Sequence, residues 1–81
     1  MSAIRDLIET VARALADSPN RVAVTEAEHR GTTLIEVTVA PTDAGKLIGR
    51  QGRTIAAMRT LAGIAGEKAG EKITLEVRDS G

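Results

Sequence analysis

The sequence predicts an α+β domain in which helices pack on one face of a three-stranded mixed sheet. Two observations predict this fold class. Apolar residues recur at helical spacing in some segments and alternate in others, and the segments follow the order helix, strand, strand, helix, helix, strand. A chain of 81 residues is also the size of one domain, which we expect to fill residues 1–81 with a core from about 4 to 77.

The first half of the chain predicts a helix followed by a hairpin. Ser2 is a suitable cap for a helix that runs to about Ala16. The apolar stripe expected to face the core consists of Ile4, Leu7, Ile8, Val11 and Leu15. Pro19 and its turn-forming neighbours end this helix. Alternation then predicts strands over residues 21–27 and 32–40, with a connection at 28–31 that contains Gly31.

The second half predicts two helices and a last strand. Pro41 closes the second strand, and Thr42 or Asp43 is expected to cap a short helix that ends near Ile48. A second helix is predicted over residues 53–65 and a strand over 72–78. The expected ends of that helix are Gly66 and Gly70.

The connections between these elements determine the predicted sheet. The two hairpin strands pair antiparallel because their connection is short. The last strand returns through two helices, which is long enough for a crossover, so we expect it to lie parallel to the middle strand. The inward residues of the two longer strands are predicted to be Ile35, Val37, Val39, Ile73, Leu75 and Val77.

Composition excludes several classes of protein. The chain has no cysteine, so it forms neither disulfides nor a zinc–thiolate site. It has no Phe, Trp or Tyr, so a module that stacks bases on aromatic rings is not expected. His29 is the only histidine, and we interpret it as a solvated turn residue instead of a metal ligand or a catalytic base. The N-terminus does not resemble a signal peptide, and no apolar run is long enough to span a membrane, so a cytoplasmic protein is expected.

The charges are unevenly distributed although their sum is zero. Residues 44–66 contain Lys46, Arg50, Arg53 and Arg59 and no acidic residue, whereas acidic residues outnumber basic ones in the remainder. A neutral chain with one basic island is typical of a protein with a single site for an anionic partner.

The centre of that island is the turn Gly49-Arg50-Gln51-Gly52 between the two predicted helices. Two glycines three residues apart allow a sharp turn that presents backbone amides without a neighbouring Cβ. The free N–H groups and the positive dipole end of the next helix point into the same space. A phosphate placed there would meet these donors together with Arg50 and Arg53, and Lys46 is one turn away.

A structural interpretation is also open. Glycines between helices are commonly C-caps, and the basic residues beside them are commonly solvated. The spacing of a nucleotide-binding P-loop is not met, because Gly45 is followed four residues later by Gly49 and then by Arg50-Gln51, and not by Gly-Lys-Ser/Thr after five. We find no catalytic constellation, and therefore expect a protein that is not an enzyme and uses no cofactor, metal or small-molecule substrate.

The segment Leu47-Ile48-Gly49-Arg50-Gln51-Gly52-Arg53-Thr54-Ile55 resembles the signature of the KH domain. The element order resembles the type II arrangement, and a free-standing domain of this length is similar to the small bacterial KhpA (YlqC) family. The resemblance implies that the GxxG loop, Gly49 to Gly52, clamps the backbone of about four single-stranded nucleotides, with Lys46 and Arg53 as flanking contacts. It also implies an apolar groove for the bases. Here the candidate lining is Ile48, Ile55, Val37 and Val39.

A second predicted surface lies on the helix over 53–65. Its inward sector contains Ile55, Met58, Ala62 and Ala65, whereas Ile64 lies outside the sector and Leu61 at its edge. These two residues are candidates for a dimer interface or are simply exposed. The family resemblance implies pairing, either with a second copy or with a larger KH protein of the KhpB or Jag type.

Three functional hypotheses follow. The first is an RNA chaperone or post-transcriptional regulator that grips single-stranded RNA with low sequence specificity. The second is a protein-interaction module that uses the same scaffold only to dimerise. The third is a ribosome-assembly factor. Single-stranded DNA also stays open as a ligand, because no residue is identified that would read a 2′-hydroxyl.

Overall fold

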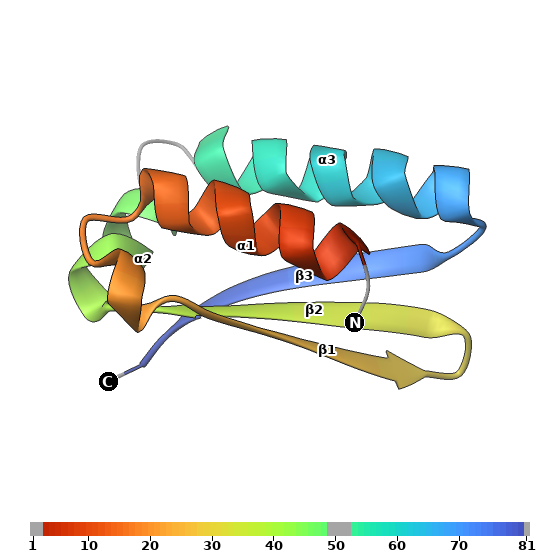
Figure 1. Cartoon of the computed structure of the whole chain (residues 1–81), viewed down its shortest axis with the longest axis horizontal. Coiled ribbons are helices and arrows are strands. Elements are labelled where there is room, and N and C mark those ends of the chain that lie inside the picture. Colours follow the sequence, from red (N-terminus) through yellow and green to blue (C-terminus); the bar gives the residue numbers. More distant parts are fainter. Residues whose placement is uncertain (1–2, 49–52, 81) are drawn as a thin grey trace.

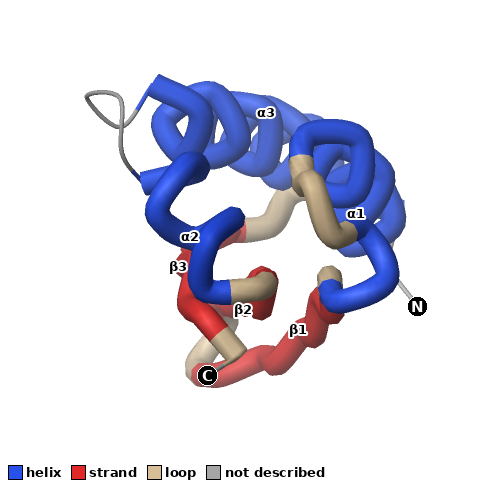
Figure 2. The backbone as a smooth tube through the Cα atoms, turned by 90° about the vertical axis from the view of Figure 1, so that its left-hand side faces the viewer, coloured by secondary structure: helices blue, strands red, loops and turns tan. Residues whose placement is uncertain are grey.

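The computed structural model describes residues 3–48 and 53–80. Its elements, in chain order, are α1 (Ala3–Leu15), the short 3₁₀ turn η1 (Pro19–Arg21), β1 (Ala23–His29), β2 (Thr32–Val39), α2 (Pro41–Ile48), α3 (Arg53–Ala69) and β3 (Lys72–Asp79). The helices form one layer and the sheet forms the other, with α1 and α3 side by side over the same face (Figures 1 and 2). The predicted element order and the α+β class are confirmed.

The sheet has the order β1-β2-β3, so β2 is central and β3 is an edge strand. β1 pairs antiparallel with β2, and β2 pairs parallel with β3, as predicted. The hairpin is tighter than expected, because His29 pairs with Thr32 and only Arg30 and Gly31 turn the chain. Both turn residues have positive φ, 52° and 78°, which is the conformation of a two-residue hairpin turn. His29 therefore ends a strand, where it is exposed, and does not lie in a connection.

The core lies between the two layers. All the predicted inward residues of β2 and β3 are buried or partly buried, and Ile35, Val37 and Val39 are completely inaccessible. The buried face of α1 is a row of residues four apart, Ile4, Ile8 and Ala12. The prediction was wrong for Leu7 and Leu15, which are 40% and 48% exposed. Leu7 lies at the edge of the stripe, and Leu15 is the last residue of the helix.

The third helix is longer than predicted. It continues through Gly66 to Ala69 and ends at Gly70, whose φ of 73° is typical of a helix C-cap. Gly66 is buried inside the helix because β3 passes close to it. A Cβ at this position would lie 2.4 Å from Cγ1 of Ile73 and 2.8 Å from the backbone oxygen of Glu71. The glycine thus permits close helix–strand packing and does not end the helix.

The short helix α2 begins at Pro41, where a proline is favoured because the first helical N–H has no partner. The predicted caps, Thr42 and Asp43, are therefore inside the helix. Asp43 is buried, and its carboxylate accepts hydrogen bonds from the backbone N–H groups of Asp17 (2.9 Å) and Ser18 (3.0 Å). It consequently caps the connection after α1 and not its own helix.

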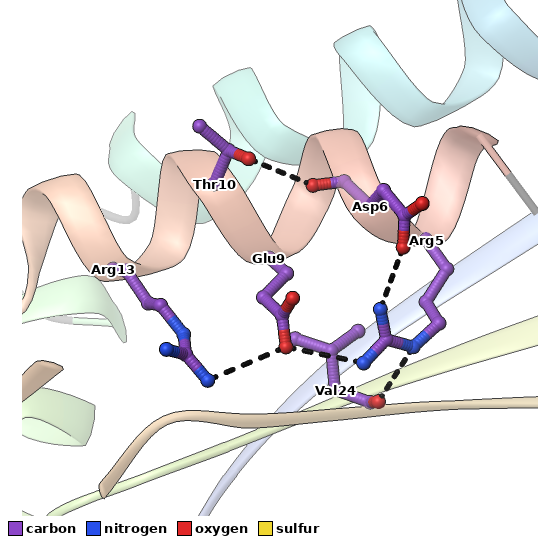
Figure 3. A network of polar contacts seen from close by, with 6 residues as sticks. All are labelled: Arg5, Asp6, Glu9, Thr10, Arg13 and Val24. Atoms are coloured by element: carbon purple, nitrogen blue, oxygen red, sulfur yellow. Dashed lines mark hydrogen bonds and ion pairs between the residues drawn. The ribbon is translucent and has the colours of Figure 1, made fainter. Parts of the chain in front are cut away.

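A polar network holds α1 to the edge of the sheet (Figure 3). The Nε of Arg5 donates to the backbone oxygen of Val24 in β1 at 3.0 Å. The two terminal nitrogens of the same guanidinium bind Asp6 at 2.8 Å and Glu9 at 3.1 Å, and Glu9 also accepts from Arg13 at 3.5 Å. Through these contacts the Arg5 guanidinium links α1 to the backbone of β1.

Candidate functional site

The glycine turn itself, Gly49 to Gly52, lies outside the described residues, but the structure describes the two helices that flank it. α2 ends at Ile48 and α3 begins at Arg53, so the turn joins two helices as predicted. The side chain of Arg53 also lies outside the description. The first N–H groups of α3 have no partner within the helix, and the positive end of its dipole lies beside the turn.

The two isoleucines that flank the turn do not anchor its helices in the core. Ile48 is 51% exposed, and Ile55, which was predicted in the inward sector of its helix, is only partly buried. Leu47 and Met58 are the anchors, with 3% and 1% of their surfaces exposed. The buried face of the short helix α2 consists of Asp43, Ala44 and Leu47. Ile48, the next residue, does not lie on that face.

An open groove with two hollows runs between α3 and β3. The first hollow has a volume of about 280 Å³, and its lining comprises Arg59, Ala62, Ile73, Thr74, Leu75 and Glu76. The second has a volume of about 490 Å³, and its lining comprises Ile48, Ile55, Arg59, Glu76, Val77 and Arg78. Ile48 is the last residue of α2 and Ile55 lies in the first turn of α3, so the second hollow borders the two helix ends that flank the turn.

The groove has a different wall from the predicted one. Val37 and Val39 were candidates for its lining, but both are fully buried under the helices. The reason is that β2 is the central strand, whereas β3 is at the edge and borders the space beside α3. Ile48 and Ile55 do line the groove, as predicted.

Arg59 is a groove residue that the sequence placed in the basic island but did not assign to the groove. It lines both hollows, and its Nε donates to the backbone oxygen of Leu75 at 3.2 Å. The available signals were its place in the acid-free stretch and its position one helical turn after Ile55. Those signals do not reveal which strand it faces.

Lys46, predicted as a flanking contact, is exposed on α2 and forms an ion pair with Asp17. This ion pair joins a residue that precedes the hairpin in the sequence to one that follows it. It also means that one basic residue of the island has a carboxylate as its partner. Asp43 lies on the same helix. Hydrogen bonds from the backbone of Asp17, then of Ser18, and the charges of Lys46 and Arg21 lower the pKa of Asp43 against the effect of burial. The Asp43 carboxylate therefore stays ionised and helps to hold α2 in place.

The second predicted surface is solvent-accessible. Leu61 and Ile64 on α3 are 41% and 49% exposed. Beside them, a shallow apolar hollow of about 360 Å³ lies between α1 and α3, lined by Ala3, Ile4, Leu7, Ala65, Lys68 and Ala69. Five large apolar side chains of the described residues are exposed in all, and two of them, Leu61 and Ile64, lie on α3.

Two other kinds of site were sought in the described part of the chain. Residues 3–48 and 53–80 contain no group of three or more His, Cys, Asp or Glu side chains placed to hold a metal ion. Among the same residues, none of the helices combines the length and apolar character needed to cross a bilayer.

Comparison with known proteins identifies the family. Residues 5–77 match the family model described as KhpA/KhpB, KH domain. A relative from Aquifex aeolicus, named RNA-binding protein KhpA, is 43% identical over 77 residues that cover 95% of this chain and 98% of the relative. A protein of the same name from Caldanaerobacter subterraneus is 42% identical over 72 residues, which cover 89% and 96% of the two chains.

Solved structures of Era share the fold. A variant of Era from Aquifex aeolicus superposes with a TM-score of 0.63 at 18% identity. Era in complex with a segment of 16S ribosomal RNA superposes with a TM-score of 0.65 at 19% identity. In both comparisons the match covers 94% of this chain and 29% of the Era chain, and at these identities the likeness shows the fold alone.

Proposed function

The chain belongs to the KhpA/KhpB family of KH domains, and on that premise we propose that it binds single-stranded RNA through the turn Gly49-Arg50-Gln51-Gly52. The observation that supports the proposal is a hollow lined by residues from both helices that flank the turn. Ile48 and Ile55 stand on either side of the turn and line the second hollow. A strand whose phosphates lie on the turn can therefore place its bases in the groove along α3 and β3.

The lining of the groove favours weak sequence discrimination. Its apolar walls are aliphatic, and bases that contact them gain burial without hydrogen bonds that distinguish one base from another. The backbone contacts at the turn are likewise independent of sequence. A protein of this kind acts in the cytoplasm as an RNA chaperone or post-transcriptional regulator, and gains selectivity from a partner.

Charge reversal at the turn tests the site. Arg50→Asp combined with Gln51→Asp changes the charge by three units where phosphates are expected, so crosslinking to RNA should be lost while the far-UV circular dichroism spectrum is retained. His29→Asp combined with Arg30→Asp is the matched control. It changes the charge equally at the hairpin, at the opposite end of the molecule (Figure 1), where Asp tolerates the positive φ of residue 30.

The result has a direct interpretation. If the turn variant crosslinks as well as the wild type, the site assignment is wrong. If both variants lose binding equally, binding reflects overall charge and not the turn. Salt provides a second criterion, since a phosphate-binding site weakens steeply as salt rises, whereas a protein-pairing surface on aliphatic residues does not.

We also propose that the exposed face of α3 mediates pairing, with a second copy or with a larger KH protein of the KhpB type. The supporting observation is the exposure of Leu61 and Ile64 next to the apolar hollow between α1 and α3. Ile64→Asp places a charge on this face, so the chain should elute as a monomer in size-exclusion chromatography while the monomer still binds RNA. Unchanged association would exclude Ile64 from the interface. Loss of RNA binding together with pairing would show that the two activities are not separable.

A further inference from the structure

Arg59 is the only described side chain that borders both hollows of the groove from α3. It stands between them, since one hollow extends toward Ala62 and Ile73 and the other toward Ile48 and Ile55. A strand that occupies both hollows must therefore pass this guanidinium.

The guanidinium is held in place by the backbone. Its Nε donates to the backbone oxygen of Leu75 at 3.2 Å, and Leu75 is a buried residue of β3. The oxygen is free for this contact because β3 is an edge strand with β2 on one side only. A guanidinium that is hydrogen-bonded through Nε still has its two flat faces and both terminal nitrogens available to contact a ligand.

The surroundings of Arg59 suit a neutral ring better than a phosphate. Glu76 lines both hollows and would repel an anion placed in either. The remaining walls are aliphatic apart from Thr74 and Arg78, and Arg78 is paired with Glu36 at 3.5 Å. Phosphates are thus directed to the turn, and the hollows are left for bases.

The chain has no aromatic residue to stack such bases. Nucleobases also stack on Arg guanidinium planes, which attract their π-faces. We propose that Arg59 is the stacking platform of this groove, with its guanidinium between two successive bases, one in each hollow. This inference rests on the proposed RNA-binding function and assigns to Arg59 the part that an aromatic ring has in other single-strand binders.

Two substitutions separate the plane of Arg59 from its charge. Arg59→Lys keeps the charge and removes the plane, whereas Arg59→Tyr keeps a plane and removes the charge. The probes are an oligoadenylate of about eight nucleotides, twice the length that a KH loop clamps, and the same backbone without bases. Affinities are measured by fluorescence anisotropy over a salt series. Arg13→Lys and Arg13→Tyr, at an exposed site on α1, are the matched controls.

If Arg59 stacks bases, the lysine variant should bind oligoadenylate at least about fivefold more weakly than the wild type, and the tyrosine variant should bind more tightly than the lysine variant. The loss in the lysine variant should be absent with the base-free backbone. Thermal unfolding verifies that each variant is folded. If the lysine variant is not folded, the tyrosine variant is used alone. It should keep its preference for oligoadenylate over the base-free backbone only if the flat side chain at position 59 stacks on bases.

The reverse order, with lysine close to wild type and tyrosine weak, would show that Arg59 acts as a charge and would overturn the inference. An equal loss with the base-free backbone would do the same. A failure of the proposed function is distinct: the wild type then binds neither probe, or binds undiminished after the double Asp substitution at the turn, and the stacking role falls with it.

Discussion

Alanine at Gly66 and at Gly63 should change stability in opposite directions although both residues lie in α3. In a helix interior, replacing glycine by alanine stabilises the fold by up to about 1 kcal/mol, because alanine loses less backbone entropy. At Gly63 a Cβ would have no neighbour within 4 Å, so only this gain applies. At Gly66 the same Cβ enters occupied space.

The size of the clash follows from what can move. Cγ1 of Ile73, at 2.4 Å, belongs to a side chain and can rotate away. The backbone oxygen of Glu71, at 2.8 Å, cannot, because the N–H of Glu71 donates to the backbone oxygen of Gly66 at 2.7 Å and holds the two segments together. Overpacking of this kind costs about 1–3 kcal/mol. Loss of the hydrogen bond would add about 1 kcal/mol.

The expected net result for Gly66→Ala is a loss of about 2 kcal/mol after the helix gain is subtracted. Gly63→Ala should gain up to about 1 kcal/mol. For a domain of this size, these values correspond to a melting temperature about 10 °C below the wild type and about 5 °C above it, respectively.

The assay is thermal unfolding followed by far-UV circular dichroism, which needs no aromatic residue. Protein concentration is held equal across variants, because any self-association would make the melting temperature depend on it. A Gly66→Ala variant as stable as the wild type, or a shift of the same sign in both variants, would refute the argument that close packing of α3 on β3 requires glycine there.

Two further predictions concern Asp17, which pairs with Lys46 of α2, and Asp43, which lies within α2. Asp17→Asn should release Lys46, which raises affinity for single-stranded RNA and steepens the slope of log affinity against log salt by up to about 0.7; an unchanged slope would mean that Lys46 takes no part in binding. Asp43→Asn should lower stability at neutral pH, because the N–H groups of Asp17 and Ser18 bind different oxygens of the carboxylate and the amide NH2 group replaces one of them. Since the pKa of Asp43 is lowered in the folded state, its contribution is present above the ordinary value of 3.8 and is lost as pH falls through the lower, folded value. Urea midpoints measured from neutral to acidic pH should therefore converge for wild type and variant at low pH, and parallel curves would contradict this role.

Several elements could be predicted from the sequence because their signals are local. The alternation of Ile35, Val37 and Val39 identifies a half-buried strand, and Ile73, Leu75 and Val77 repeat it. Connection length then decides that the first pair of strands is antiparallel and the second parallel. The position of the turn between α2 and α3 follows from glycine spacing alone.

The ends of helices and strands were less predictable where a residue departs from its usual backbone conformation or its usual structural role. The end of the first hairpin strand was placed too early, at residue 27. The strand continues to His29 because Arg30 adopts a φ of 52°, which is rare for a non-glycine residue and lets two residues turn the chain. The end of α3 was placed too early because glycine commonly ends helices. At Gly66 the reason for glycine is the neighbouring strand, which no local pattern contains.

The sequence by itself determined the order of elements, the class of fold and the basic glycine turn, since each depends on residues a few positions apart. Only the tertiary structure decided the partners of the site. Asp43 binds backbone 25 and 26 residues earlier, Lys46 pairs with a residue 29 positions away, and Arg59 is held by a strand 16 residues later. Such contacts form because packing of α1, α2 and α3 on the sheet brings distant segments together. The periodicity of apolar residues within one segment does not specify which other segment it will contact.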